Sequence, residues 1–210
     1  RHYPLARGGG ATMDFDIVLS FGPICRTKYQ LLRTFGKDEC PSSVFDWQRT
    51  PMSAIRFYLE NDFRGTFERE DLEVSGRSVV NRKLRTSHLH AFPQHVANDE
   101  IDRYYSRARS RHDHLCDKTR AVLRGDGRVL ICVGTHLQPY RWLRLNLAIR
   151  RYAPKLCFRL LNGPADDYPD EMWEGDDALW DRHLARFGKK AEAAPPSVSR
   201  EAAFTAGEPT

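Results

Sequence analysis

The sequence predicts an α/β fold, a single domain in which a largely parallel sheet is flanked by helices. Short apolar runs alternate along the chain with longer segments of helical periodicity, which is typical of parallel strands joined by helices. One of these runs, residues 128–134, is apolar almost throughout, as expected for a strand buried on both faces. The 210 residues, 40% hydrophobic and 29% charged, are enough for one domain with a sizeable core.

The first elements are a strand, a tight turn and a helix. Residues 15–21 form an apolar run that is predicted to be a strand, and Gly22-Pro23 interrupts it. A helix is predicted over 25–35, and a loop follows over 37–50. Thr50-Pro51 has the pattern of a helix N-cap followed by proline at the first helical position, so a second helix is predicted to begin there.

The middle of the chain carries weaker signals and one long helix. Residues 64–84 are charged and irregular, with a short strand indicated at 78–80. Residues 87–93 are interpreted as a strand end and a loop. The stripe of apolar residues over 98–124 predicts the longest helix, which Gly125 ends.

The last elements repeat the alternation of strand and helix. After strand 128–134, a helix is predicted over 140–152 and stops before Pro154. The apolar run 156–161 predicts another strand, and a final helix is predicted near 176–187.

The ends of the chain differ in composition from its centre. Residues 1–12 contain three consecutive glycines and no apolar core of a secretory signal. They are expected to be disordered or foreign to the natural chain, which we expect to start at Met13. The domain is predicted to span 13–188. The tail 189–210, rich in Ala, Pro, Ser and Glu, is expected to be disordered.

Composition narrows the compartment and the partners. The five cysteines are odd in number and form no Cys-x-x-Cys pair, which argues against a disulfide framework and a zinc ribbon and favours a reducing cytoplasm. The net charge of +5 is dispersed and interleaved with acidic residues, so no nucleic-acid partner is predicted. No apolar run approaches the ~20 residues of a membrane helix, so no membrane insertion is expected.

Cys25 is the candidate nucleophile. It lies at or near the first turn of the helix that follows the first strand, and parallel sheets bind ligands at the carboxyl ends of their strands. The field and the unpaired N–H groups of a helix N-terminus stabilise a thiolate and can hold an oxyanion. The alternative is that Cys25 is a small apolar residue that packs in a strand-to-helix turn.

A cysteine nucleophile needs a base, and His90 and His136 are the two candidates. His90 lies in a predicted strand-to-loop junction, and His136 follows strand 128–134, so both belong to loops of the kind that display catalytic residues. His112 and His114 are two residues apart on the long helix and therefore point to different sides. No metal site is predicted.

Three short motifs resemble those of a family of bacterial papain-like cysteine peptidases, which is largely uncharacterised. The motifs are Ser20-Phe-Gly-Pro-Ile-Cys25, Ser43-Val-Phe-Asp46-Trp47 and His90-Ala-Phe92. The resemblance covers Asp14 to about Gly134. Val44 stands where the family favours Pro, and Ala91 stands where it favours Asp.

The resemblance implies a thiol–imidazole pair in which Cys25 is the nucleophile and His90 the base. His136 stays the alternative base because of its place after strand 128–134. Asp46 is the first candidate for a third residue that orients the imidazole. The alternative is that Asp46 supports its loop by accepting backbone N–H bonds.

Three functions follow as alternatives. The family implies hydrolysis of a peptide or of an acylated small molecule or glycan, which requires no cofactor. A more distant resemblance to papain-like acetyltransferases of capsule polysaccharide implies acyl transfer from coenzyme A to a polysaccharide or sugar. Arg141 and Arg144, at the start of helix 140–152, would then meet the phosphates. The third alternative is a non-catalytic binding module, which the replacement at Ala91 favours.

Overall fold

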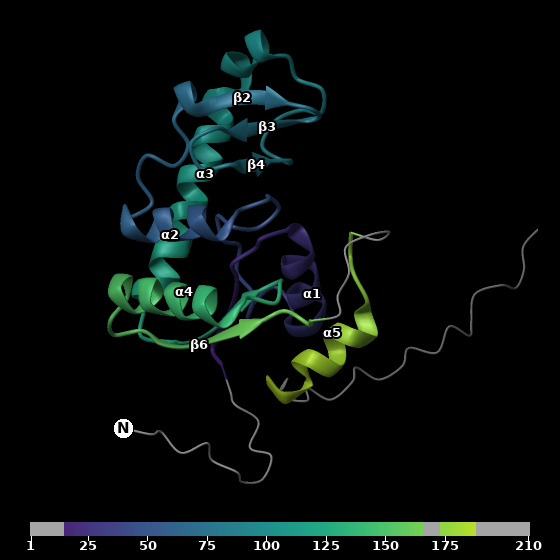
Figure 1. Cartoon of the computed structure of the whole chain (residues 1–210), viewed down its shortest axis with the longest axis vertical. Coiled ribbons are helices and arrows are strands. Elements are labelled where there is room, and N and C mark those ends of the chain that lie inside the picture. The colour runs from purple at the N-terminus through teal and green to yellow at the C-terminus, as the bar shows by residue number, and fades with distance from the viewer. Residues whose placement is uncertain (1–14, 166–172, 188–210) are drawn as a thin grey trace, which may run out of the picture.

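A three-stranded parallel sheet organises the lower part of the molecule (Figure 1). The computed structural model describes residues 15–165 and 173–187. The strands lie in the order β1 (Ile17–Ser20), β5 (Arg128–Val133) and β6 (Cys157–Asn162), and all are parallel. The three predicted apolar runs therefore form strands of one sheet, and their carboxyl ends share one edge.

Helices cover both faces of this sheet because its strands are apolar on both sides. On one face, Leu130 and Cys132 pack in a core with α1 (Cys25–Phe35) and α5 (Asp177–Leu184), which η3 (Ala185–Phe187) extends. On the other face, Ile131 and the alternate residues of β5 pack with α2 (Met52–Glu60) and α4 (Pro139–Tyr152). The arrangement confirms the predicted α/β class.

A second sheet, which is antiparallel, lies in the upper part of Figure 1. Its strands are β2 (Leu72–Ser75), β3 (Ser78–Asn81) and β4 (Thr86–His88), and η1 (Arg69–Asp71) precedes it. The sequence indicated a short strand at 78–80 and a strand end at the start of 87–93, and it did not indicate β2. The expectation of a largely parallel sheet therefore holds for one of the two sheets. Strands of three or four residues with polar outer positions are too short for their apolar alternation to be recognised in the sequence.

The long helix α3 (Ile101–Arg124) connects the two parts, and η2 (Asn98–Glu100) forms its first turn. Near its start, Ile101 and Ala108 pack in the apolar core of the antiparallel sheet. Near its end, Cys116 and Leu123 pack in the core between the parallel sheet and helices α2 and α4. The predicted helix over 98–124 is confirmed, with a first turn of 3-10 geometry.

The predictions for residues 1–12 and 189–210 lie outside the described residues. Among the helices that the structure describes, none combines the length and the apolar character needed to cross a membrane.

Candidate functional site

The turn between β1 and α1 places Cys25 as the first residue of the helix. Gly22 has a φ of +62°, a left-handed conformation that favours glycine, and its carbonyl accepts hydrogen bonds from Thr27 Oγ1 and Gly134 N. Ile24, at the N-cap, has no side-chain acceptor, so it leaves the N–H groups of the first turn uncapped. Cys25 is half-buried at this edge of the sheet.

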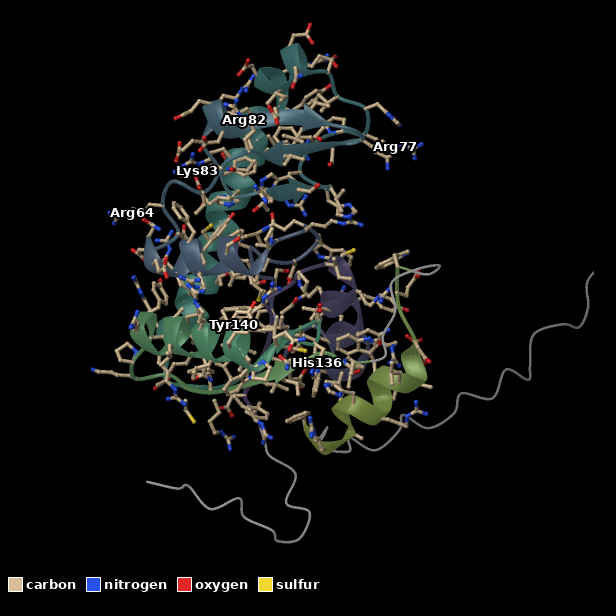
Figure 2. All side chains as sticks on the ribbon, in the orientation of Figure 1. Arg64, Arg77, Arg82, Lys83, His136 and Tyr140 are labelled. Carbon is tan, nitrogen blue, oxygen red and sulfur yellow. The ribbon has the colours of Figure 1, made fainter. Side chains whose placement is uncertain are left out.

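The loop after β5 approaches this turn closely. A Cβ atom added to Gly134 would lie 1.7 Å from Thr27 Oγ1, so only glycine fits between β5 and α1. His136 follows two residues later, at the same carboxyl edge of the sheet as Cys25, and is exposed. Figure 2 shows His136 and Tyr140 in the lower part of the molecule, away from Arg77 and Arg82 beside the antiparallel sheet.

A buried ion pair ties the loop 37–50 to α1. Lys28 Nζ lies 3.2 Å from Asp46 Oδ2, and both side chains are at most 2% exposed. The same ammonium donates to the carbonyls of Cys40 and Pro41 at 2.8 and 2.6 Å. These contacts fix the loop that presents Trp47, which has a positive φ of 59°.

Asp46 accepts hydrogen bonds within its own loop, as the alternative interpretation of this residue predicted. Its carboxylate accepts hydrogen bonds from Ser43 N and Ser43 Oγ at 2.9 and 3.0 Å. Burial raises the pKa of the Asp46 carboxyl, and the charge of Lys28 opposes that rise. Within the described residues, no hydrogen bond joins Asp46 to a histidine, so the geometry gives it a role in supporting the loop.

A row of aromatic rings runs from α1 to the loop after β4. Tyr29, one helical turn after Cys25, packs edge-on against Trp173 at 5.2 Å between centroids. Trp173 packs against Trp47 at 6.4 Å, and Trp47 against the His90 ring at 6.1 Å. We call Tyr29, Trp173, Trp47 and His90 the aromatic row. It links the neighbourhood of Cys25 to His90, which is exposed.

The segment that carries Trp173 is fixed by buried polar groups of α1. Arg26 is 2% exposed, and its Nε donates to the Trp173 carbonyl at 3.1 Å. Gln30 Nε2 donates to the Glu174 carbonyl at 2.7 Å. Arg26, which follows the candidate nucleophile, therefore holds the aromatic row in place and does not project into solvent.

A recess of about 50 Å³ opens beside His90. Exposed His90 and Arg111 line it together with buried His88, Gln48 and His112. The remaining lining residues are Val44, Asp46, Trp47, Phe67, Ala91, Ala108 and Leu115. We call this cavity the His88 recess. Cys25 does not line it, so the recess joins Asp46 and His90 but not the thiol.

Two histidines inside the fold face the ring of Phe67. The rings of His88 and His112 each lie 4.6 Å from the Phe67 centroid. Burial lowers the pKa of His88 to about 3 and that of His112 to about 4. His112 hydrogen-bonds Tyr58 Oη at 2.9 Å, whereas His114 is exposed. The two histidines of α3 thus point to different sides, as predicted.

The five cysteines are free and differ in surroundings. Burial raises the thiol pKa of Cys40 to about 11 and of Cys116 to about 12, and raises that of buried Cys132 further. Cys157 is exposed at the start of β6. Only Cys25 combines partial exposure with a helix N-terminus.

The two arginines predicted for a cofactor lie on α4, whose first turn follows β5 as expected. Both are exposed, and Arg141 Nε donates to Tyr140 Oη at 2.8 Å. Arg144 lines a groove of about 660 Å³ between α2 and α4. Three more arginines line the same groove, namely Arg56, Arg124 and Arg151. Arg144 thus belongs to a different cavity from His90.

Sequence reasoning missed two contributors to the site, Trp173 and Gln48. Trp173 lies beyond the segment covered by the family resemblance, and no local pattern connects it to Cys25. Gln48 directly follows the Phe-Asp-Trp motif, but no sequence pattern marks its partner His88, because the three residues of β4 are all polar.

Neither a search for metal ligands nor a comparison with known proteins assigns a function to this site. Within residues 15–165 and 173–187, no group of three or more His, Cys, Asp or Glu is arranged to hold a metal ion. Comparison of the chain with protein-family models, with curated proteins and with solved structures finds no match, so the functional conclusion depends on the geometry of this site.

Proposed function

We propose that this protein is a cysteine-dependent acyl-transfer enzyme of papain-like chemistry, acting as a hydrolase on a peptide or an acylated small molecule or glycan. The observation that carries the proposal is the position of Cys25. It is the half-buried first residue of α1, at the carboxyl edge of the parallel sheet, with no side-chain cap on the helix. The first-turn N–H groups there can stabilise an oxyanion that forms beside the sulfur.

The proposed reaction uses the Cys25 thiol as nucleophile and one histidine as general acid and base. A histidine takes the thiol proton, and the Cys25 thiolate attacks the acyl carbon to form a C–S bond. The tetrahedral oxyanion collapses, the leaving group departs with the proton from the imidazolium, and a thioester stays on Cys25. Water, deprotonated by the same histidine, then attacks the thioester and releases the acid and the thiol. His90 and His136 are the candidates for this base.

The test is selective alkylation. We expect a limiting dose of iodoacetamide at neutral pH to label Cys25 before the other cysteines, as read by mass spectrometry. Cys157 is the matched control, because it is more exposed and lies at no helix N-terminus. Exposure alone predicts that Cys157 reacts first. Labelling of Cys157 before Cys25 would contradict the proposal.

The base is tested by the same measurement on variants. If His90 is the base, His90→Ala slows labelling of Cys25 at neutral pH while His136→Ala does not. If His136 is the base, His136→Ala slows labelling of Cys25 and His90→Ala does not. His95→Ala, at another exposed histidine of the same loop region, is the control. No change in either His90→Ala or His136→Ala would favour a non-catalytic binding module.

A second candidate function is acyl transfer from coenzyme A, for which the groove lined by Arg144 is the supporting observation. Arg56 and Arg124 pair with Glu60 and Asp62, which also line the groove, so Arg144 and Arg151 are the cations that a phosphate would meet. Isothermal titration separates the two functions: coenzyme A binding in the micromolar range favours transfer, and no heat at millimolar ligand leaves hydrolysis. The five free thiols are consistent with a reducing compartment such as the cytoplasm.

A further inference from the structure

The His88 recess contains hydrogen-bonding groups that the fold leaves unused. His88 is 3% exposed and Gln48 is 7% exposed. His88 Nδ1 lies 3.0 Å from Gln48 Oε1, which uses one atom of each side chain. The other two atoms, His88 Nε2 and Gln48 Nε2, are buried and have no partner at hydrogen-bond distance; the Tyr58 hydroxyl, which lies near the Gln48 amide, bonds His112 Nε2 instead at 2.9 Å. Buried polar atoms without a partner are uncommon in folded proteins and indicate a place for a ligand or water.

The pair offers one donor and one acceptor whichever way the amide is oriented. With Gln48 Oε1 facing the ring, His88 carries its proton on Nδ1, so Nε2 is a free acceptor and the amide NH₂ a free donor. With the amide turned over, the NH₂ donates to Nδ1, so His88 carries its proton on Nε2. The free donor is then Nε2–H and the free acceptor is the amide oxygen.

The charges of the side chains that line the recess also restrict the ligand. His88 and His112 are neutral at neutral pH, since burial lowers the pKa of each well below 6.5. Asp46 is ion-paired with Lys28. The exposed guanidinium of Arg111 lies at the mouth. The interior therefore has no unpaired charge to attract an ion, and it suits a neutral polar group.

The size and the walls set the dimensions of the ligand group. The His88 recess has a volume of about 50 Å³. One water needs ~10–15 Å³, so the recess has room for a group larger than a single water. Its volume is far below the ~300 Å³ of a pocket for a whole small molecule. The walls include Phe67 and Leu115, which would pack against the flat or apolar side of such a group.

We propose that the His88 recess binds a primary carboxamide of the ligand, which donates to one member of the His88–Gln48 pair and accepts from the other. The binding site itself is independent of the reaction. Its assignment as the pocket for part of the substrate rests on the proposed function, because exposed His90, the candidate base, lines its mouth. A substrate with an asparagine- or glutamine-like side chain, or a terminal amide, has this chemistry.

The experiment is an NMR titration that observes the ring nitrogens of His88. Acetamide is the probe, and acetone is its counterpart of similar shape that accepts but cannot donate. We expect acetamide to shift the His88 Nε2 resonance saturably at about millimolar concentration. Acetone should bind at least ~10-fold more weakly, because it leaves one buried group unpaired. An equal response to the two probes, or no saturable response to acetamide, overturns the proposal; the latter means that water alone fills the recess.

Variants assign the effect to the pair. Gln48→Met keeps the length of the side chain and removes its donor and acceptor, so we expect at least a ~10-fold loss of acetamide affinity. Gln94→Met, the same change at an exposed glutamine, is the matched control and should bind as the wild type does. The backbone amide spectrum checks that each variant is folded. Unchanged binding by folded Gln48→Met contradicts the proposal.

The proposed function of Cys25 and the proposed carboxamide site can each be refuted without refuting the other. Cys25→Ala removes the proposed nucleophile, yet it should bind acetamide with unchanged affinity because Cys25 does not line the recess. Loss of acetamide binding in that variant would contradict the placement of the ligand group. Conversely, slow alkylation of Cys25 together with acetamide binding would overturn the proposed function and leave the recess as a binding site.

Discussion

The buried histidines should make the protein sensitive to mild acid. Burial lowers the pKa of His88 to about 3 and of His112 to about 4, whereas an unfolded histidine titrates near 6.5. Below about pH 6.5 the unfolded chain therefore binds protons that the folded protein does not. The free energy of unfolding is largest above that pH and falls as the pH falls toward 4.

The size of the effect follows from the two shifts. Each histidine removes about 1.4 kcal/mol of stability per pH unit between its unfolded and folded pKa values. From neutral pH to pH 5, this is about 2 kcal/mol for each histidine and about 4 kcal/mol for both. Asp16 and Asp102, whose pKa values Arg128 and Arg69 lower, lose their contributions only near or below pH 4.

Urea unfolding at a series of pH values between 7.5 and 5 measures this loss. We expect His112→Gln, which can still accept a hydrogen bond from Tyr58, to lose about half as much stability over that range as the wild type. His114→Gln, at the exposed histidine two residues away, should behave as the wild type does. If His112→Gln keeps the full pH dependence, then His112 is not a buried neutral histidine and the reasoning is wrong.

Three further substitutions test the contacts that position the site, each by the free energy of unfolding in urea. Lys28→Met should cost about 3–5 kcal/mol, because it leaves Asp46 buried without its cation; a cost below 1 kcal/mol would mean that water replaces Lys28. Gly134→Ala should cost about 1–3 kcal/mol, because its Cβ would overlap Thr27 Oγ1. Adding Thr27→Ala to this variant should recover part of the lost stability. If the double variant recovers none, the strain does not come from the contact with Thr27. Tyr58→Phe should cost about 1–3 kcal/mol, because His112 Nε2 loses the hydrogen bond to the Tyr58 hydroxyl and keeps only a long contact with Cys116 Sγ; a neutral result would refute that hydrogen bond.

The parallel sheet could be predicted from the sequence because its signals are local. The runs that became β1, β5 and β6 are apolar on both faces, and the segments between them have helical periodicity. Cys25 was placed correctly in the first turn of the helix for the same reason, since Gly22-Pro23 marks the turn before it. These features depend on neighbours in the chain and need no knowledge of tertiary contacts.

The antiparallel sheet and the surroundings of Asp46 depend on distant contacts. The strands of that sheet are short, and their inner residues meet α3, which starts more than ten residues later. Asp46 meets Lys28, a residue that the sequence places in the middle of a helix with no mark of burial. A lysine is normally solvated, so its burial could not be expected without the fold.

The ion pair of Lys28 and Asp46 explains why motifs far apart in the sequence belong to one site. Lys28 belongs to the helix that Cys25 begins, and Asp46 belongs to the loop that presents Trp47. Ser43 Oγ also donates to the Ser20 carbonyl at 2.9 Å, at the end of β1. The Cys motif and the Phe-Asp-Trp motif are therefore bound to each other through buried polar contacts. A substitution at Asp46 should therefore disturb the position of Trp47, and with it the contact of Trp47 with the His90 ring.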